Sequence, residues 1–509
     1  MSAGRGARRQ GGIRMAIIAV ATCATATMAG SCRGRGEAHP RSASLTVLRV
    51  GVAQLSATNP TAGLRQLSQN QAVENLMRVG EDGRFQPWLA ESLAVAPNGR
   101  SLTVKLRPGV KFHDGSPLDA AAVVEMLPSA LRSFMGSLSS GIEYVRAAGN
   151  DAVEIGFQEP APFLRESLEV PIQKPGPRVV GTGPFMSDPH SQTDLLANPD
   201  YYLGQSLVGR IRLESYPSLR AAWAELLRGR LDMLYDVGPD SFSSLEGASN
   251  VAVFTFARRY QYVIALNNEA PVLQRRETRR ALNMAIDRAA IVRNALSGQG
   301  IASSGLIWPR HWAFSPEVAT FQFDPKQAGK LAGPVQGESK KAGTIRFTCL
   351  VPAGAEFERI ALETKRQLGA VGVDMFAEEV SQEQLMQRLA SRQFDAALLD
   401  VVGGPTLLRP YLLWHSKMPL NPGGLGNPTI DAALDRVQRA PSENEYRHAV
   451  AALQRAFLDD PPAIFLAWSV RARAVSRRFL VPSTEPGRDV VNTLRLWKPV
   501  TDTAQLNRN

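Results

Sequence analysis

Several residue types and motifs that carry chemistry are scarce in this chain. Only three cysteines occur in 509 residues, and Cys349 has no obvious partner. A disulfide framework is therefore excluded, and we expect Cys349 to be a small buried residue of a strand. The chain also has no phosphate-binding glycine loop, no zinc-binding His/Glu helix and no G-x-S-x-G nucleophile turn. We therefore predict no catalytic residue, no cofactor and no metal site, and we do not expect an enzyme.

Long hydrophobic runs are also missing, apart from one near the N-terminus. Arginine-rich Met1–Arg14 precedes the apolar run Met15–Met28, and the small residues Ala29–Ser31 follow. This order of basic, apolar and small residues is typical of a secretory signal peptide, which we place at residues 1–31. The run is too short to span a bilayer. We therefore expect an exported protein.

Cys32 follows the predicted signal peptide directly. The sequence Ala29-Gly30-Ser31-Cys32 resembles a bacterial lipobox, in which the cysteine is lipidated and becomes the mature N-terminus, although Ala29 stands where leucine is usual. Residues 32–44 are mostly small or polar, which suits a tether. The resemblance implies a lipid anchor at Cys32 on the periplasmic or extracytoplasmic face of a bacterial membrane. An ordinary signal peptide with a chance cysteine is the alternative.

Positive charge is in excess but is not gathered in one stripe. The formal net charge is +11, and the four arginines of residues 1–31, which contain no acids, leave +7 for the rest. The remaining basic residues form small clusters at Arg275-Arg276, Arg279-Arg280 and Arg471–Arg478. A nucleic-acid interface favours one basic stripe with interleaved aromatic residues. We therefore predict no nucleic-acid partner and interpret these clusters as solvated faces.

The middle of the chain indicates a crossing between two folded lobes. A length of 509 residues is too great for one core. Within Arg259–Val292, side chains alternate over Tyr260–Leu266 as in a strand, and apolar residues then recur at helical spacing over Thr278–Ile286. Blocks of α/β pattern lie on both sides. We expect the chain to cross between lobes here, with the ligand in the crease and Arg471–Val475 on the return path.

The second half predicts a parallel sheet, because strand and helix patterns alternate with short connections. The expected elements are a strand at Thr344–Val351, a helix at Glu356–Leu368, a strand at Gly372–Glu378, a helix at Gln382–Ala390 and a strand at Phe394–Val401. In the first half, Gln71–Val79 is expected to be a short helix, and Leu494–Trp497 is expected to complete the sheet of the first lobe.

The stretch Asp82–Leu127 carries a spaced pattern that resembles a known family. The matching positions are Pro87, Leu89-Ala90-Glu91-Ser92, Leu106-Arg107, Gly109-Val110, Phe112–Gly115, Pro117 and Val123. They resemble the extracytoplasmic solute-binding proteins, family 5, of peptide, nickel and related ABC importers, as does Gly181–Phe185. The resemblance implies an α/β fold of two lobes, of the periplasmic-binding-protein type (class II-like, cluster C), with an extra small subdomain in the first lobe.

The resemblance also implies domain boundaries. They are residues 45–75, 180–262 and 476–509 for the first lobe, 76–179 for its small subdomain and 263–475 for the second lobe. Within the small subdomain, His113-Asp114 is a tempting metal or acid–base pair. A His-Asp-Gly turn, however, uses the aspartate to bond the backbone and Gly115 to take positive φ, and we expect such a structural turn.

The expected ligand contacts have two sources. Asn59 and Thr61 follow the first strand, Leu45–Ala53, and ligands of open α/β sheets collect beyond the carboxyl ends of strands. The resemblance adds the loop after the strand that ends at Val401. Relatives that bind peptides commonly carry an aspartate at the position of Val401, and its absence argues against an ordinary free-amine peptide as the ligand. A buried ammonium would lack a partner unless Asp400 supplies one through a shift in register. The full set of expected contacts is Asn59, Thr61, Tyr262, Trp308, Asp400, Val401, Gly403 and Trp414.

The resemblance implies the substrate-binding component of an ABC importer. Such a protein captures a peptide-like or other small solute between two lobes and delivers it to the permease subunits in the membrane. We expect a monomer. Two alternatives remain at this point: a ligand sensor that acts through a membrane partner, and a secreted hydrolase with paired carboxylates, for which no evident pair is found.

Overall fold

A computed structural model describes most of the chain after the N-terminal region. The described residues are 46–53, 62–160, 166–238, 247–332, 345–421, 427–483 and 488–500. The predicted signal peptide, the tether and Cys32 lie outside them, as do Asn59 and Thr61. Residues 45–509 form one unit, to which all the described elements belong.

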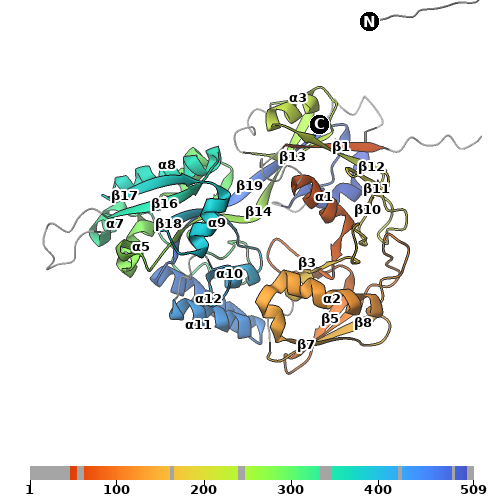
Figure 1. Ribbon diagram of the computed structural model, residues 1–509, viewed down its shortest axis with the longest axis horizontal. Helices are drawn as coiled ribbons and strands as arrows, with labels where there is room; N and C mark the ends of the chain where they lie inside the picture. The colour runs from red at the N-terminus through yellow and green to blue at the C-terminus, as the bar shows by residue number, and fades with distance from the viewer. Residues whose placement is uncertain are drawn as a thin grey trace, which may run out of the picture. The chain divides into compact units, whose positions relative to one another are not determined.

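One mixed sheet of eleven strands runs through this unit. Its strand order is β10-β11-β12-β1-β13-β19-β14-β18-β16-β17, and β15 pairs with β19. The two longest strands, β14 (Val251–Leu266) and β19 (Ala463–Ser476), lie side by side in the middle. Figure 1 shows them running from the strands around β1 to those around β18. They are the predicted crossing strands.

Lobe I contains the strands on one side of the two crossing strands. In it, β1 (Val47–Ala53) is parallel to β12 (Arg210–Tyr216) and to β13 (Met233–Val237). The remaining elements are β10 (Phe185–Ser187), β11 (Asp194–Ala197), α1 (Ala62–Ala72), α3 (Leu219–Leu227), β20 (Phe479–Leu480), a 3₁₀ helix at Val490–Leu496 and β21 (Lys498–Pro499). The expectation of a sheet strand at Leu494–Trp497 is therefore wrong. Trp497 is fully buried against Phe479 instead, and it anchors the 3₁₀ helix to the core of the lobe.

The small subdomain has its own antiparallel sheet, in the order β5-β6-β8-β7. Its strands are β5 (Ala90–Val95), β6 (Ser101–Leu106), β7 (Ile142–Ala147) and β8 (Ala152–Phe157), and α2 (Ala120–Met135) packs on them. The Asp119 carboxylate caps α2 by accepting from the backbone N–H of Ala122 at 2.9 Å. The short pieces nearby are β2 (Glu74–Asn75), β3 (Met77–Val79), β4 (Phe85–Pro87), β9 (Pro171–Ile172) and 3₁₀ helices at Gly136–Gly141 and Glu166–Glu169.

The segment Gln71–Val79 is not the helix that we expected. Helix α1 ends at Ala72, and the chain continues as β2, which pairs with β9, and β3, which pairs with β4. Glu74 explains the change, because its buried carboxylate accepts hydrogen bonds from Trp88, Thr182, Tyr201 and Tyr202. These partners come from distant parts of the chain, so the helical periodicity of the segment could not reveal them.

The His113-Asp114-Gly115 turn is structural, as predicted. Asp114 accepts from the backbone N–H of Ser116 at 3.1 Å, and Gly115 has φ +83°. His113 Nε2 lies 3.0 Å from the Gly183 carbonyl. Among the described residues, no group of three or more His, Cys, Asp and Glu side chains is arranged to hold a metal ion.

Lobe II contains the parallel strands β16, β17 and β18, as the alternating pattern predicted. The main elements are β16 (Arg346–Pro352), α8 (Ala355–Gly369), β17 (Asp374–Val380), α9 (Gln382–Ala390), β18 (Ala396–Val402), α11 (Pro428–Arg439) and α12 (Glu443–Asp459). Shorter ones are a 3₁₀ turn at Pro271–Leu273, α5 (Arg276–Met284), α6 (Arg288–Ala290), a π-helical turn at Ile291–Ala295, β15 (Gly300–Ala302), α7 (Pro325–Ala332) and α10 (Leu408–Trp414). Cys349 is fully buried in β16, as expected.

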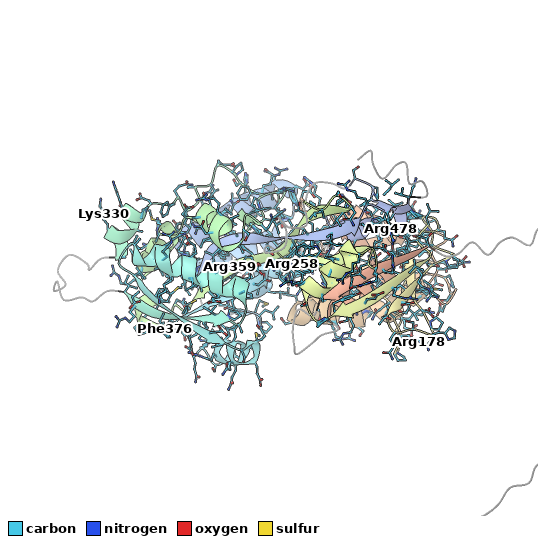
Figure 2. The ribbon with its side chains drawn as sticks, turned by 90° about the horizontal axis from the view of Figure 1, so that it is seen from above. Arg178, Arg258, Lys330, Arg359, Phe376 and Arg478 are labelled. Atoms are coloured by element: carbon cyan, nitrogen blue, oxygen red, sulfur yellow. The ribbon has the colours of Figure 1, made fainter. Side chains whose placement is uncertain are left out.

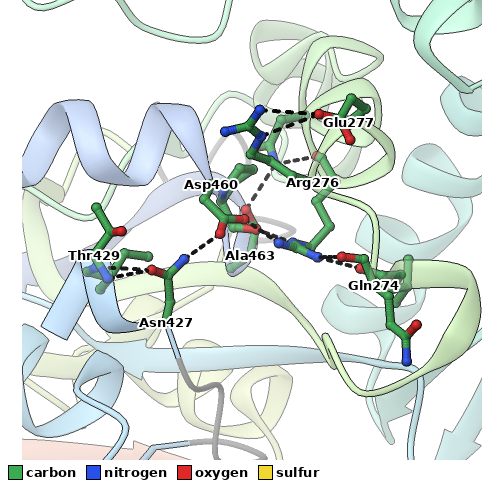
Figure 3. Close-up of polar contacts among 12 residues, drawn as sticks. Gln274, Arg276, Glu277, Asn427, Thr429, Asp460 and Ala463 are labelled. Atoms are coloured by element: carbon green, nitrogen blue, oxygen red, sulfur yellow. Dashed lines mark hydrogen bonds and ion pairs between the residues drawn. The ribbon is translucent and has the colours of Figure 1, made fainter.

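The arginines of α5 and of β19 are not all solvated, which corrects the interpretation of both clusters as solvated faces. In β19, Arg473 is 5% exposed and pairs with Asp489. Arg279 is only 5% exposed and pairs with Asp460. It also donates to the Leu273 and Pro461 carbonyls. Figure 3 shows the surrounding network, in which Asn427 donates to Asp460 at 2.5 Å. Arg279 therefore ties α5 to the segment that leads into β19.

Candidate ligand-binding site

The site begins with the register of the crossing strands. Tyr262 of β14 lies opposite Asp400 of β18, and Gln261 lies opposite both Val401 of β18 and Trp468 of β19. Directly opposite residues of paired strands point to the same face. Tyr262 and Asp400 therefore share one face, and Gln261 and Trp468 share the other. The β14–β19 register shifts between Ala257 and Gln261, which is the kind of irregularity that re-aims side chains next to sites.

An ionic cluster covers the first face. The Tyr262 hydroxyl donates to Glu356 Oε1 at 2.6 Å, and Arg471 donates to both oxygens of Glu356, at 3.1 and 2.7 Å. Glu356 lies in the first turn of α8, where the helix dipole favours a negative charge. Burial alone would raise the pKa of Glu356, but Arg471 and the hydrogen bond from Tyr262 hold that pKa below its ordinary value. Glu356 and Arg471 therefore form a charged pair at neutral pH.

Asp400 lies beside this pair without a full set of partners. Its Oδ2 is 3.5 Å from Arg258 Nη1, whereas its buried Oδ1 has no partner. Burial raises the pKa of Asp400 to about 6, against the opposing effect of Arg258 and Arg471. Figure 2 shows Arg258 between the two lobes. A buried carboxylate oxygen without a donor is costly, so a ligand that donates to Asp400 Oδ1 would remove this cost.

Two tryptophans form the second face. Trp468 is fully buried, and its ring lies 5.0 Å from that of Trp308 in an edge-to-face arrangement. A Cβ atom on Gly403 would lie 2.9 Å from the Trp468 ring. Gln261 donates to the Gly305 carbonyl at 2.8 Å and fixes the loop that leads to Trp308. The absence of a side chain at Gly403 is therefore what lets Trp468 pack against the end of β18.

We predict that Gly403→Ala destabilises the protein by about 1–3 kcal/mol, because the added methyl group forces the Trp468 ring to move. Gly305→Ala is the matched control, since a Cβ there meets nothing within 4 Å. Differential scanning calorimetry measures both variants. Equal unfolding temperatures for Gly403→Ala and the wild type would show that the Trp468 ring has room to spare.

The structure brings some of the expected contacts together and separates others. Tyr262 and Asp400 meet in the ionic cluster, and Gly403 and Trp308 both lie against Trp468. Trp308 is only 4% exposed, and its indole N–H donates to the Glu81 carbonyl at 2.8 Å.

Two further expected contacts lie in the core of lobe II. Val401 and Trp414 belong to the same buried cluster, in which Trp414 packs against Phe457 and Phe465 with ring centroids 6.1 and 5.5 Å away.

Four residues of the site were not expected from the sequence as ligand contacts: Arg258, Glu356, Trp468 and Arg471. The signal for Arg471 was its place at the end of an otherwise apolar run, Ala463–Val470, where only Ser469 is polar. Trp468 Nε1 and Arg471 Nε are buried donors without a partner. Arg471 Nε and Asp400 Oδ1 belong to the first face and offer a ligand one donor and one acceptor there, whereas Trp468 Nε1 lies on the second face.

This arrangement defines a class of protein. Two lobes joined by long crossing strands, with unsatisfied polar groups at the crossing, are typical of a protein that binds a small solute between lobes. In the part of the chain that the structure describes, no helix has the length and apolarity needed to cross a bilayer.

Comparison with known proteins identifies the family. The family described as bacterial extracellular solute-binding proteins, family 5 Middle, matches residues 84–417, and the chain therefore belongs to it. The oligopeptide-binding protein AppA of Bacillus subtilis (strain 168) is 24% identical over 481 residues, which are 84% of this chain and 86% of that protein.

Two further proteins are similar to this chain. The glutathione-binding protein GsiB of Escherichia coli (strain K12) is 27% identical over 284 residues, 51% of this chain and 54% of that protein. The crystal structure of NikZ from Campylobacter jejuni in complex with Ni(L-His) has the same fold, with a TM-score of 0.73 at 20% identity, and the match covers 89% of this chain and 99% of that one. The predicted two-lobed α/β fold is thereby confirmed. Members of this family are extracytoplasmic binding proteins rather than enzymes.

Proposed function

We propose that this chain is the substrate-binding component of an ABC importer and that it takes a small polar solute at the crossing of β14, β18 and β19. The observation that carries the proposal is the pair of unpartnered buried atoms on the first face of this crossing, Asp400 Oδ1 and Arg471 Nε. A ligand that offers one donor and one acceptor would satisfy both and remove their desolvation cost. Compact zwitterions such as amino acid derivatives, short peptides and amino acid chelates have these groups.

In this proposal the two lobes rotate about β14 and β19 and close on the solute, and the permease subunits recognise the closed form. Asn59, Thr61, Tyr262, Trp308, Val401, Gly403 and Trp414 remain proposed contacts or neighbours of the ligand. The domain boundaries, the monomeric state, the signal peptide and the lipid anchor at Cys32 are part of the same proposal. Mass spectrometry of the N-terminus of the membrane-bound protein tests the anchor, since an unmodified start at any other residue excludes it.

A thermal-shift screen of the chain from residue 33 onward tests ligand binding. The compounds are chosen from the chemistry of the relatives: di- to pentapeptides, glutathione, Ni(II) with L-histidine, and small sugars as a class without charge. A ligand at about 100 times its Kd stabilises the protein by about 2.7 kcal/mol, which raises the unfolding temperature by a few degrees. We expect charged compounds to raise it and sugars to leave it unchanged. Turnover of a glycan without any thermal shift would contradict the proposal and favour a hydrolase.

A further inference from the structure

A tight turn of the small subdomain rests on lobe II. The turn connects β3 to β4 at residues 80–84 and is closed by its own hydrogen bonds, from Gly83 N to Gly80 O at 3.1 Å and from Gly80 N to Arg84 O at 2.9 Å. The Asp82 carboxylate accepts from the Arg84 backbone N–H at 3.0 Å. These bonds fix the shape of the turn before it meets a partner.

The backbone of the turn is bonded to lobe II at two successive carbonyls. The Glu81 carbonyl accepts from Trp308 Nε1 at 2.8 Å, and the Asp82 carbonyl accepts from the Trp312 backbone N–H at 2.9 Å. Bonds to a backbone that is already fixed lose little conformational entropy on formation.

Gly83 lies where only glycine fits. Its φ is +80°, and a Cβ atom there would lie 2.6 Å from the Pro405 carbonyl oxygen and 2.8 Å from the His311 ring. Burial lowers the pKa of His311 to about 4, and its Nδ1 accepts from the Ala313 N–H, so this ring is neutral at pH 7. The turn therefore meets an uncharged, close-fitting surface.

Arg84 completes the contact with its side chain. Its guanidinium lies 4.5 Å from the centroid of the Trp312 ring, which stacks on Tyr446 with centroids 5.1 Å apart, and it pairs with Glu443 at 3.1 Å. A cation over an aromatic face is stabilised by the ring quadrupole.

A second contact between the same two parts supports the first. Phe134 and Leu138 pack against both the core of the small subdomain and that of lobe II. Arg409 of lobe II lies 5.1 Å from the centroid of the Phe134 ring. The turn is thus one part of a wider junction between two units that the crossing strands would otherwise leave free to rotate.

We propose that the turn at residues 80–84 is a clasp that holds the small subdomain on lobe II, with Gly83 and Arg84 as its positioning residues. All its bonds run between atoms of the protein, so no ligand atom takes part in it. A large share of the molecules therefore adopts the closed form without ligand. Trp308 serves the clasp through its indole N–H and also packs edge-to-face on Trp468. The clasp does not depend on which solute the protein binds.

The test measures the distance between the two parts in solution without any ligand. Nitroxide labels on Glu143→Cys of β7 and Glu383→Cys of α9, both exposed, report this distance by double electron–electron resonance. Cys349 is buried and stays unlabelled, and a chain that starts at residue 33 lacks the other two cysteines. We expect a dominant short distance in the otherwise wild-type protein. Gly83→Ala and Arg84→Met are expected to move at least half of that population to longer distances.

Two matched variants separate the clasp from general damage. Gly109→Ala puts the same strain on a glycine with φ +76° whose Cβ would meet nothing within 4 Å. Arg100→Met removes an exposed arginine of the same subdomain that pairs with Glu159 at 3.7 Å. Both are expected to keep the short distance. If Gly83→Ala does not fold, Arg84→Met decides. The proposal is overturned if the wild type shows only the long distance or if Arg84→Met keeps the wild-type distribution.

Discussion

Asp400→Asn is expected to make the protein more stable above pH 6 and to weaken solute binding at the same time. The Asp400 side chain is only 19% exposed, one of its oxygens lacks a partner, and burial raises its pKa from 3.8 to about 6. Each pK unit corresponds to about 1.4 kcal/mol, so the ionised group costs the folded state up to ~3 kcal/mol. Asparagine has nearly the same shape without that charge. Loss of a hydrogen bond to a charged group should lower solute affinity by at least tenfold.

The pH dependence of this effect has a definite sign. Between about pH 4 and pH 6 the folded state holds a proton on Asp400 that the unfolded state has lost, so stability falls as the pH rises through this range. Above pH 6 the whole cost is present, and below pH 4 it is absent. The difference in unfolding temperature between Asp400→Asn and the wild type should therefore be several degrees near pH 7.5 and should shrink toward zero near pH 4.

Asp114→Asn is the matched control, because the bonds that Asp114 makes with Lys174 and Ser116 lower its pKa to about 2. Its charge stabilises the folded protein at neutral pH, so this variant should be less stable near pH 7.5 and closer to the wild type in acid. Calorimetry at both pH values measures the two variants. A lower unfolding temperature for Asp400→Asn near pH 7.5 would mean that its charge is well paired, and unchanged affinity would remove Asp400 from the site.

The sequence predicted the fold well because the fold depends on local patterns. The alternation in Tyr260–Leu266 and the strand–helix repeats of lobe II survive in the structure with ends shifted by a few residues. The errors arose where distant partners override local pattern. Glu74 accepts hydrogen bonds from four side chains elsewhere in the chain, so the helix ends at Ala72 and does not continue to Val79. Arg279 is buried because it donates to carbonyls of other segments.

The site was only partly predictable for a related reason. Tyr262 and Asp400 could be placed near the crossing, but their alignment on one face depends on the β14–β18 register. The position of Arg471 depends further on the register shift between β14 and β19. A shift of one residue would turn every side chain to the other face. No local sequence pattern fixes the register between paired strands, so the roles of Glu356 and Arg471 became evident only in the structure.

Arg471→Met is expected to lower the free energy of unfolding by about 3–5 kcal/mol, because it leaves the Glu356 charge buried without its partner. The side chains of Arg471 and Glu356 are only 11% and 20% exposed. The double variant Arg471→Met/Glu356→Gln should regain most of the loss, since it removes the remaining charge and keeps an oxygen that accepts from the Tyr262 hydroxyl. The comparison of Arg471→Met with the double variant therefore shows how much of the loss comes from the charge left on Glu356.

The matched control is Arg346→Met, which breaks an ion pair with Asp374 whose side chains are 76% and 44% exposed. Exposed pairs contribute at most about 1 kcal/mol, so this variant should unfold almost as the wild type does. Urea unfolding followed by circular dichroism measures all four proteins. A double variant no more stable than Arg471→Met would mean that the arginine acts through packing alone. In that case its unpartnered Nε would no longer support a role in binding the solute. Recovery of stability in the double variant, together with loss of solute affinity, would instead show that Arg471 both neutralises Glu356 and binds the solute.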